Sequence, residues 1–216
     1  MKPYYEHAGI TIYHGDCREV LPHVEAGAVV TDPPYGQNLD TDYRRFSRKD
    51  RTRPTSSFYQ RIAGDDSEFD PSPWLTFQRV VLFGFNHFSA QVPTGTLLVW
   101  IKKTDGQFGT FLSDCEVAWM KGGSGVYARR CLGKDPRKHK RQHPTEKPVP
   151  IMRWCIEKAC KETDVILDPY MGSGTTLVAA KNLGRSAIGI EIEEHYCEIA
   201  AERLSQDILP GINAGA

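Results

Sequence analysis

The chain has 216 residues, 40% of them hydrophobic and 25% charged, which is typical of a folded domain and excludes a largely disordered protein. Its 27 basic and 27 acidic residues give zero net charge, which excludes a uniformly basic coat. The longest purely apolar run, Leu97 to Ile101, is too short to span a membrane, and the first residues lack the apolar core of a secretion signal. No Cys-x-x-Cys pair occurs among the six cysteines, so we expect reduced thiols in a cytoplasmic protein without a metal site.

Short apolar, β-branched runs alternate with segments that favour helices. This alternation predicts an α/β fold in which a mostly parallel sheet has helices on both faces. We expect strands over residues 10–14, 28–31, 96–101, 116–120, 165–167 and 187–190, and helices over residues 17–24, 72–91, 150–161, 175–182 and 194–208. Residues 1–216 are predicted to form a single domain.

Two basic segments interrupt this pattern. Residues 44–61 and 129–141 each contain seven basic residues and one acidic residue, so together they carry +12 and the rest of the chain carries −12. Such blocks suit a polyanion, although either block alone could be a solvated loop. They lie in two predicted loops, 37–70 and 121–142, and the first loop also holds aromatic residues that could stack on bases. We therefore expect both loops to be insertions that bind a nucleic acid.

A glycine-containing turn follows the predicted strand 165–167. It runs from Asp168 through Pro169, Gly172, Ser173 and Gly174 to Thr175, and its glycines permit close approach of the backbone to a ligand. Glu191 ends the next predicted strand, where a carboxylate can accept hydrogen bonds from both hydroxyls of a ribose. Together these features indicate a nucleoside-type ligand. Taken singly, the glycines could form an ordinary turn, and Glu191 could favour the dipole of the following helix.

The segment Asp32-Pro33-Pro34-Tyr35 follows another predicted strand. The two prolines remove amide donors, so the Asp32 carboxylate and nearby carbonyls form an acceptor-rich corner beside an aromatic ring. A flat base could stack on Tyr35 while its amino group donates to Asp32 and to the Pro33 carbonyl. An ordinary turn is the alternative interpretation of this tetrapeptide.

Two further segments carry candidate binding residues. In His143-Pro144-Thr145-Glu146-Lys147-Pro148, Thr145 and Lys147 could hold a carboxylate, or the segment could be a plain loop that enters a helix. In Gly15-Asp16-Cys17, Asp16 could accept from the amino group of an adenine, or it could cap a helix.

With these motifs in this order, the chain resembles the DNA amino-methyltransferases, in particular the subgroup with Asp-Pro-Pro-Tyr ahead of the cofactor loop. The resemblance runs from about Ile10 to Leu204, with gaps at the two basic loops. It implies a Rossmann-like methyltransferase fold with a seven-stranded sheet, S-adenosylmethionine as cofactor, double-stranded DNA as partner, and a monomer or homodimer. The catalytic residues that it implies are Asp32, Pro33, Pro34 and Tyr35. The cofactor-binding residues that it implies are Asp16, Cys17, Asp32, Thr145, Lys147, Asp168, Pro169, Gly172, Ser173, Gly174, Thr175 and Glu191.

The resemblance implies methylation of adenine N6, since Asp rather than Ser precedes Pro-Pro-Tyr. The alternatives are N4-cytosine methylation, methylation of RNA or of a protein side chain, and a catalytically silent nucleic-acid-binding module. Relatives with a defined target usually carry a larger recognition region than residues 121–142 provide. We therefore expect short or relaxed sequence selectivity.

Overall fold

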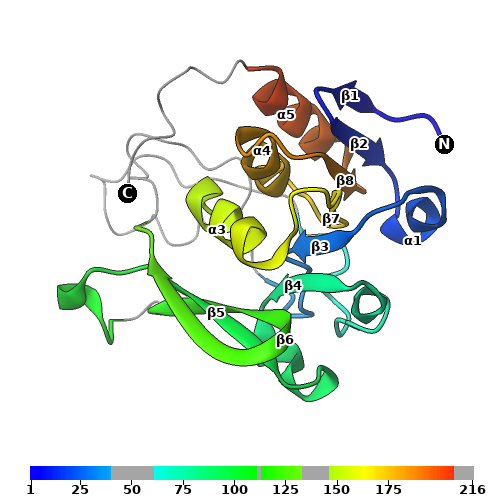
Figure 1. Ribbon diagram of the computed structural model, residues 1–216. Helices are drawn as coiled ribbons and strands as arrows, with labels where there is room; N and C mark the ends of the chain where they lie inside the picture. The colour runs from blue at the N-terminus through cyan, green and yellow to red at the C-terminus, as the bar shows by residue number, and fades with distance from the viewer. Residues whose placement is uncertain (40–60, 111–112, 133–145, 207–216) are drawn as a thin grey trace.

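The structure is a computed structural model, and it describes residues 1–39, 61–110, 113–132 and 146–206. Within these residues, eight strands form one mixed sheet in the order β1-β2-β8-β7-β3-β4-β6-β5 (Figure 1). The strands are β1 Tyr5–His7, β2 Ile10–His14, β3 Ala28–Thr31, β4 Arg79–Phe83, β5 Gly95–Ile101, β6 Cys115–Arg130, β7 Ile166–Asp168 and β8 Ala187–Glu191. The helices are α1 Cys17–Val20, α2 Phe85–Phe88, α3 Val149–Ala159, α4 Thr175–Asn182 and α5 Glu194–Ser205.

The centre of the sheet is parallel. Strands β2, β8, β7, β3 and β4 pair in parallel, one after another. The predicted α/β fold with a mostly parallel sheet is therefore confirmed. The expected number of seven strands is wrong, because the short strand β1 pairs antiparallel with β2 at one edge. Its residues, Tyr5 to His7, are partly polar and too few to show a strand pattern.

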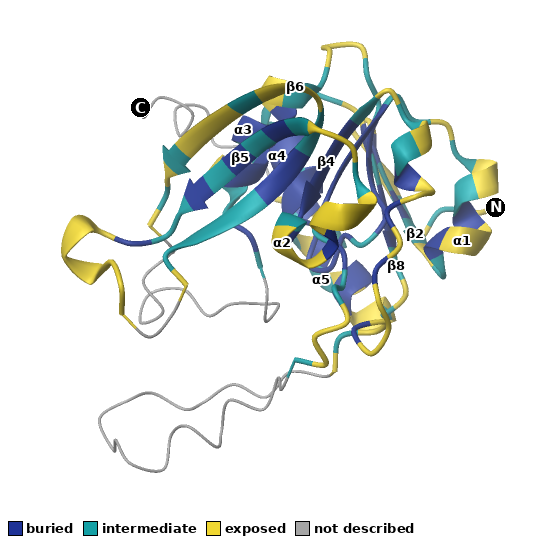
Figure 2. Cartoon of the chain, turned by 90° about the horizontal axis from the view of Figure 1, so that it is seen from below, coloured by how far each residue is buried: buried dark blue, intermediate teal, exposed yellow. Residues whose placement is uncertain are grey.

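At the opposite edge of the sheet, the residues that follow residue 121 do not form the predicted loop. Strand β6 continues to Arg130, and its two halves run in opposite directions past β5, so that Val99 pairs with both Val117 and Ala128. Gly122 and Gly123 adopt positive φ where the chain changes direction. Figure 2 shows the end of this ribbon exposed, whereas the central strands are buried. Residues 122–130 are therefore strand, and residues 133–142 of the predicted loop lie outside the described residues.

The predicted helix over residues 72–91 is also wrong. This segment forms a 3-10 turn at Trp74–Thr76, then β4, then the short helix α2 and a second 3-10 turn. Residues Val80 to Phe83 are buried on both faces of the sheet, so their continuous apolar run belongs to a central strand. Gly84 then adopts a left-handed conformation with φ 79°, which separates β4 from α2.

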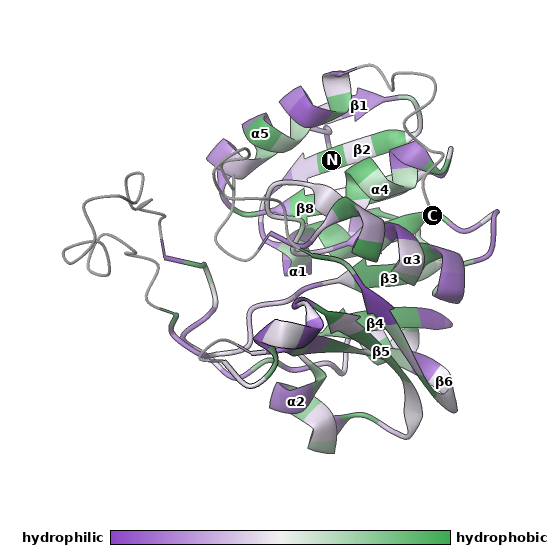
Figure 3. Ribbon diagram, turned by 90° about the vertical axis from the view of Figure 1, so that its left-hand side faces the viewer, coloured by the Kyte–Doolittle hydropathy of each residue, from purple (hydrophilic) through white to green (hydrophobic). Residues whose placement is uncertain are grey.

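Helices cover both faces of the sheet. One face packs against α3, α4 and α5, and the other packs against α1, α2 and the turn around Trp74 (Figures 1 and 3). The predicted helix 175–182 agrees with α4, and helices 150–161 and 194–208 agree with α3 and α5 apart from their ends. The predicted helix 17–24 is shorter, since α1 passes into a 3-10 turn at Leu21–His23. Within the described residues, no helix combines the length and apolar character that crossing a membrane requires.

Candidate active site

The carboxyl ends of the parallel strands open into one cleft of about 1360 Å³. Parallel strands end at the same edge of a sheet, so the segments after β2, β3, β7 and β8 meet there. The cleft is lined by ten of the predicted site residues: Asp16, Cys17, Asp32, Pro33, Pro34, Tyr35, Lys147, Pro169, Gly172 and Glu191. A side cavity of about 40 Å³ adds Asp168, Ser173 and Thr175. Thr145 lies outside the described residues.

Asp32 is held by two side chains. The Lys147 ammonium forms an ion pair with Asp32 Oδ2, and the Tyr35 hydroxyl donates to Asp32 Oδ1. Burial raises the pKa of Asp32 to about 6, although the neighbouring Lys147 opposes that rise. Lys147 was expected to face the carboxylate of a cofactor, and in this structure its ammonium donates to the carboxylate of Asp32.

The Tyr35 ring lies in a narrow aromatic corner. It stacks on His87 of α2 with ring centroids 5.0 Å apart and an interplanar angle of 13°. His87 in turn lies within hydrogen-bond distance of Gln37 and Asn86. A Cβ atom on Gly84 would lie 2.1 Å from the Tyr35 ring, so only glycine allows the ring to rest against this backbone.

Replacing Gly84 by alanine should therefore destabilise the fold. The positive φ of Gly84 and the collision with Tyr35 lead us to expect that Gly84→Ala lowers the free energy of unfolding by about 2–4 kcal/mol. The matched control is Gly106→Ala, because a Cβ there meets nothing within 4 Å. Urea unfolding of both variants measures the effect. Equal stabilities would contradict the packing of Tyr35 against Gly84.

Asp65 holds the backbone that follows the corner formed by Asp32 to Tyr35. This buried carboxylate accepts hydrogen bonds from the amides of Tyr35, Gln37 and Leu39 at 3.2, 3.1 and 2.8 Å. The backbone amide of Asn38 also donates to the Asp65 carbonyl. Asp65 therefore holds the backbone of residues 35–39 in place. The sequence alone did not indicate this role, because Asp65 lies thirty residues after Tyr35 in a polar segment.

The glycine turn after β7 is tied to the neighbouring strands. Asp168 is buried and accepts from Thr31 Oγ1 at 2.6 Å, which joins the end of β7 to the end of β3. Glu191 accepts from the amides of Gly172 and Glu193 at 2.8 and 2.9 Å, and burial raises its pKa. Glu191 also lines the cleft.

Gly174 packs closely against α5. It adopts φ 78° at the start of α4, and a Cβ there would lie 2.7 Å from Ala200 of α5. The turn is also braced by Arg203 of α5, which donates to the carbonyl and the hydroxyl of Ser173 at 2.6 and 3.0 Å. Arg203 pairs with Glu146 at 3.3 Å, and burial lowers its pKa. A partly buried arginine on a helix face has no sequence motif, so it was not predicted.

Asp16 caps α1, as the alternative interpretation held. Its carboxylate accepts from the backbone amide of Arg18 at 2.9 Å and pairs with the exposed guanidinium of the same residue. Hydrogen bonds from Arg18 lower the pKa of Asp16. Asp16 and Cys17 nevertheless line the same cleft as Glu191, so capping the helix and lining the cleft are compatible.

The residues present fit S-adenosylmethionine. At one end of the cleft the anionic acceptors Asp16 and Glu191 lie with Tyr170 and Ile192, which suits a ribose and an adenine ring. The Gly172 turn leads from there toward the side cavity, which contains Ser173 and Thr175. Asp32 lines both cavities, so the two regions meet at the corner that contains Asp32.

Comparison with known proteins shows which family this chain resembles. The model of the N6/N4 DNA methylase family matches residues 99–202. Over 95% of its length, the chain is 28% identical to the type II methyltransferase M.ScaI of Streptomyces caespitosus, of which the match covers 84%. The chain is thus similar to the N6/N4 DNA methylase family over residues 99–202, and to one type II methyltransferase over most of its length. The name of that family covers both adenine and cytosine amino groups, so the similarity leaves the target base open.

Two further similarities support this family. The type II methyltransferase M2.LlaDCHI of Lactococcus lactis subsp. cremoris is 47% identical over 81 residues, 38% of this chain and 30% of that protein. Four such local matches cover only 22–30% of the lengths of the curated relatives. A solved structure of M1.HpyAVI in complex with S-adenosylmethionine has a TM-score of 0.58 and 26% identity, and the match covers 90% of this chain and 99% of that one.

Proposed function

We propose that this protein transfers the methyl group of S-adenosylmethionine to the exocyclic N6 amine of adenine in double-stranded DNA. One observation carries the proposal: the carboxylate of Asp32 and the carboxylate of Glu191 line the same cleft, joined by the Gly172 turn. An acceptor for an amine and an acceptor for a ribose thus share one continuous site.

The chemistry of the amine explains the need for Asp32. The lone pair of an exocyclic amine is conjugated with the ring, so the amine is a weak nucleophile. Acceptance of its N–H bonds by Asp32 and by the Pro33 carbonyl favours tetrahedral geometry at nitrogen and frees the lone pair. Bound S-adenosylmethionine supplies a methyl group that its sulfonium already activates. The protein then has to position the amine, exclude water, and accept the proton that the methylated nitrogen loses, for which Asp32 is the nearest base.

The surroundings of Tyr35 suit a base taken out of the duplex. Flipping a paired base costs a few kcal/mol, and stacking on an aromatic ring offsets part of that cost. The two basic segments, 44–61 and 129–141, would bind phosphates, so DNA affinity should fall steeply as salt increases.

The rate should depend on pH through Asp32. Only the ionised form of Asp32 accepts an N–H bond of the amine with a full negative charge and can take up its proton, and the pKa of Asp32 is raised to about 6. We therefore expect kcat to be constant above that value and to fall about tenfold per pH unit below it. Stopped-flow or single-turnover rates at saturating cofactor and DNA measure this. Binding of both ligands over the same pH range is the control, and a flat rate down to pH 5 would contradict the role of Asp32.

The function itself is tested by incubating the purified protein with labelled S-adenosylmethionine and unmethylated duplex DNA, and then identifying the labelled nucleoside. N6-methyladenine is the expected product. N4-methylcytosine would keep the fold, the cofactor and the role of Asp32 but replace the target base. Absence of label in DNA, with the cofactor still bound, would overturn the proposal in favour of RNA or of a silent binding module.

A further inference from the structure

Four charged side chains of alternating sign form a row beside the catalytic corner. From Asp32 the row passes to Lys147, which lies 3.2 Å from Glu116 Oε2, and the other oxygen of Glu116 lies 2.9 Å from Lys102. These residues come from four separate segments of the chain: the turn after β3, the entry to α3, the start of β6 and the end of β5. All four line the same cleft.

Lys147 is the buried centre of this row. Its side chain is only 8% exposed, and its ammonium also lies 5.2 Å from the centre of the Phe83 ring. An ammonium so far out of water needs anionic partners, and Asp32 and Glu116 both supply them. One cation is therefore shared between two carboxylates, and Lys102 compensates the second carboxylate from the solvent side.

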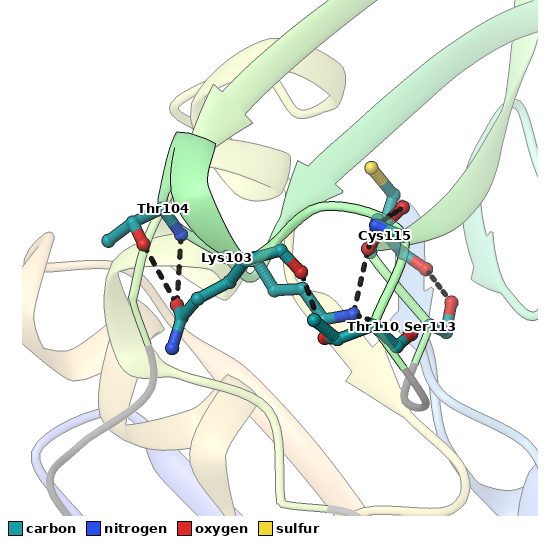
Figure 4. A network of polar contacts seen from close by, with 8 residues as sticks. Lys103, Thr104, Thr110, Ser113 and Cys115 are labelled. Atoms are coloured by element: carbon teal, nitrogen blue, oxygen red, sulfur yellow. Dashed lines mark hydrogen bonds and ion pairs between the residues drawn. The ribbon is translucent and has the colours of Figure 1, made fainter.

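The loop that joins β5 to β6 holds the outer part of the row in place. Lys103 pairs with Asp114 at 2.7 Å and donates to the Thr110 carbonyl, while the Lys102 amide donates to the Asp114 carbonyl at 2.9 Å. Figure 4 shows this network, in which Thr104 donates to Gln107 and Ser113 donates to the carbonyl of Cys115. The backbone on both sides of the Lys102–Glu116 pair is thus fixed.

We propose that Glu116 is a positioning residue for the target amine: it shares Lys147 with Asp32, so that the ammonium orients Asp32 without fully neutralising it. The inference rests on the proposed function, because it assigns Glu116 and Lys102 to the support of the same acceptor. Without the charge of Glu116, the buried ammonium has one anionic partner and binds Asp32 more tightly. Asp32 then accepts hydrogen bonds from the amine less strongly.

The direction of the pH effect separates this role from a merely structural one. The charged and titratable groups that face Asp32 are Lys147 from the entry to α3, Glu116 from β6, Asp168 from β7, and Tyr35 from its own turn. The negative charge of Glu116 raises the pKa of Asp32, so its removal lowers that pKa. Removal of the positive charge of Lys102 acts in the opposite direction, since the charge lost has the opposite sign.

The test compares Glu116→Gln and Lys102→Met in the full-length protein. For Glu116→Gln we expect a plateau kcat that is roughly tenfold lower, DNA and cofactor affinities within about twofold of wild type, and an acidic limb shifted by roughly half to one pH unit toward lower pH. For Lys102→Met, the acidic limb of the pH–rate profile should not move toward lower pH. Glu157→Gln is the matched control, because Glu157 forms an exposed pair with Arg153 on α3.

A second readout needs no catalysis. The carboxyl carbon of Asp32, labelled with ¹³C-aspartate and assigned by its loss in Asp32→Asn, is titrated in the cofactor-free protein. A lower midpoint in Glu116→Gln supports the inference. If the titration midpoint of Asp32 and the pH–rate profile are both unchanged in Glu116→Gln, the inference is overturned. A lower rate without a shift of the acidic limb of the pH–rate profile also overturns it, because that result would indicate a structural role. An inactive wild type with a shifted midpoint would overturn the proposed function alone.

Discussion

Asp32→Ala is expected to abolish methylation while leaving the binding of S-adenosylmethionine nearly intact. The variant removes the acceptor that activates the amine, and loss of such a stabilising group should lower kcat by at least about 10³-fold. Cofactor affinity should change little, because Glu191, the acceptor proposed for the ribose, is positioned by Gly172 and Glu193 and not by Asp32. Single-turnover methylation and calorimetric binding measure the two quantities separately.

The fold should survive this change, since Lys147 retains Glu116 as an anionic partner when Asp32 is lost. Asp32→Asn preserves the shape of the side chain and serves as a second variant if Asp32→Ala unfolds. The matched control is Asp66→Ala, an exposed aspartate in the segment that precedes β4. Simultaneous loss of binding and turnover in both Asp32 variants would point to a folding defect and would refute the catalytic assignment.

Glu191→Ala is expected to have the largest effect on cofactor binding. The variant removes the carboxylate that accepts from the Gly172 and Glu193 amides, so the glycine turn loses its link to the end of β8. It also removes the acceptor proposed for the ribose hydroxyls. Loss of the two hydrogen bonds from the ribose hydroxyls to this charged group corresponds to about 2–3 kcal/mol, or roughly 30- to 150-fold weaker binding of the cofactor.

Calorimetric titration with S-adenosylmethionine measures this loss, and titration with adenosine alone tests its origin. The affinity for adenosine should fall by a similar factor, because both ligands carry the same ribose. Glu198→Ala, an exposed carboxylate on α5, is the matched control. Unchanged affinity in Glu191→Ala would place the ribose elsewhere in the cleft.

Local sequence patterns correctly predicted those helices and strands in which all local signals favour the same structure. The helix 175–182 and the strands 10–14 and 28–31 agree with the structure because their residue types and flanking turn signals point the same way. The failure at residues 72–91 has a different origin. An apolar run buried on both faces has no period, so only its place between β3 and β6 makes it a strand.

The residues of the site also fall into two groups, those that the sequence indicated and those that it did not. The motifs around Asp32, Gly172 and Glu191 were found from the sequence, because each follows an apolar run at the end of a strand, where ligands of α/β folds bind. Asp65, Glu116 and Arg203 were not found. Each acts through a partner distant in the sequence, as Arg203 does with Ser173 thirty residues away. A lone charge in a polar or amphipathic segment has no local signal of such a partner.

Local sequence patterns were sufficient to predict the fold class, the order of the motifs and the residue types of the Asp32–Tyr35 corner and the glycine turn, because backbone preference and apolar periodicity are local properties. Which charges meet depends on the three-dimensional fold. It placed Lys147 on Asp32, brought Glu116 and Lys102 beside them, and turned β6 past β5, because sheet pairing sets these neighbours across distances that no local pattern encodes.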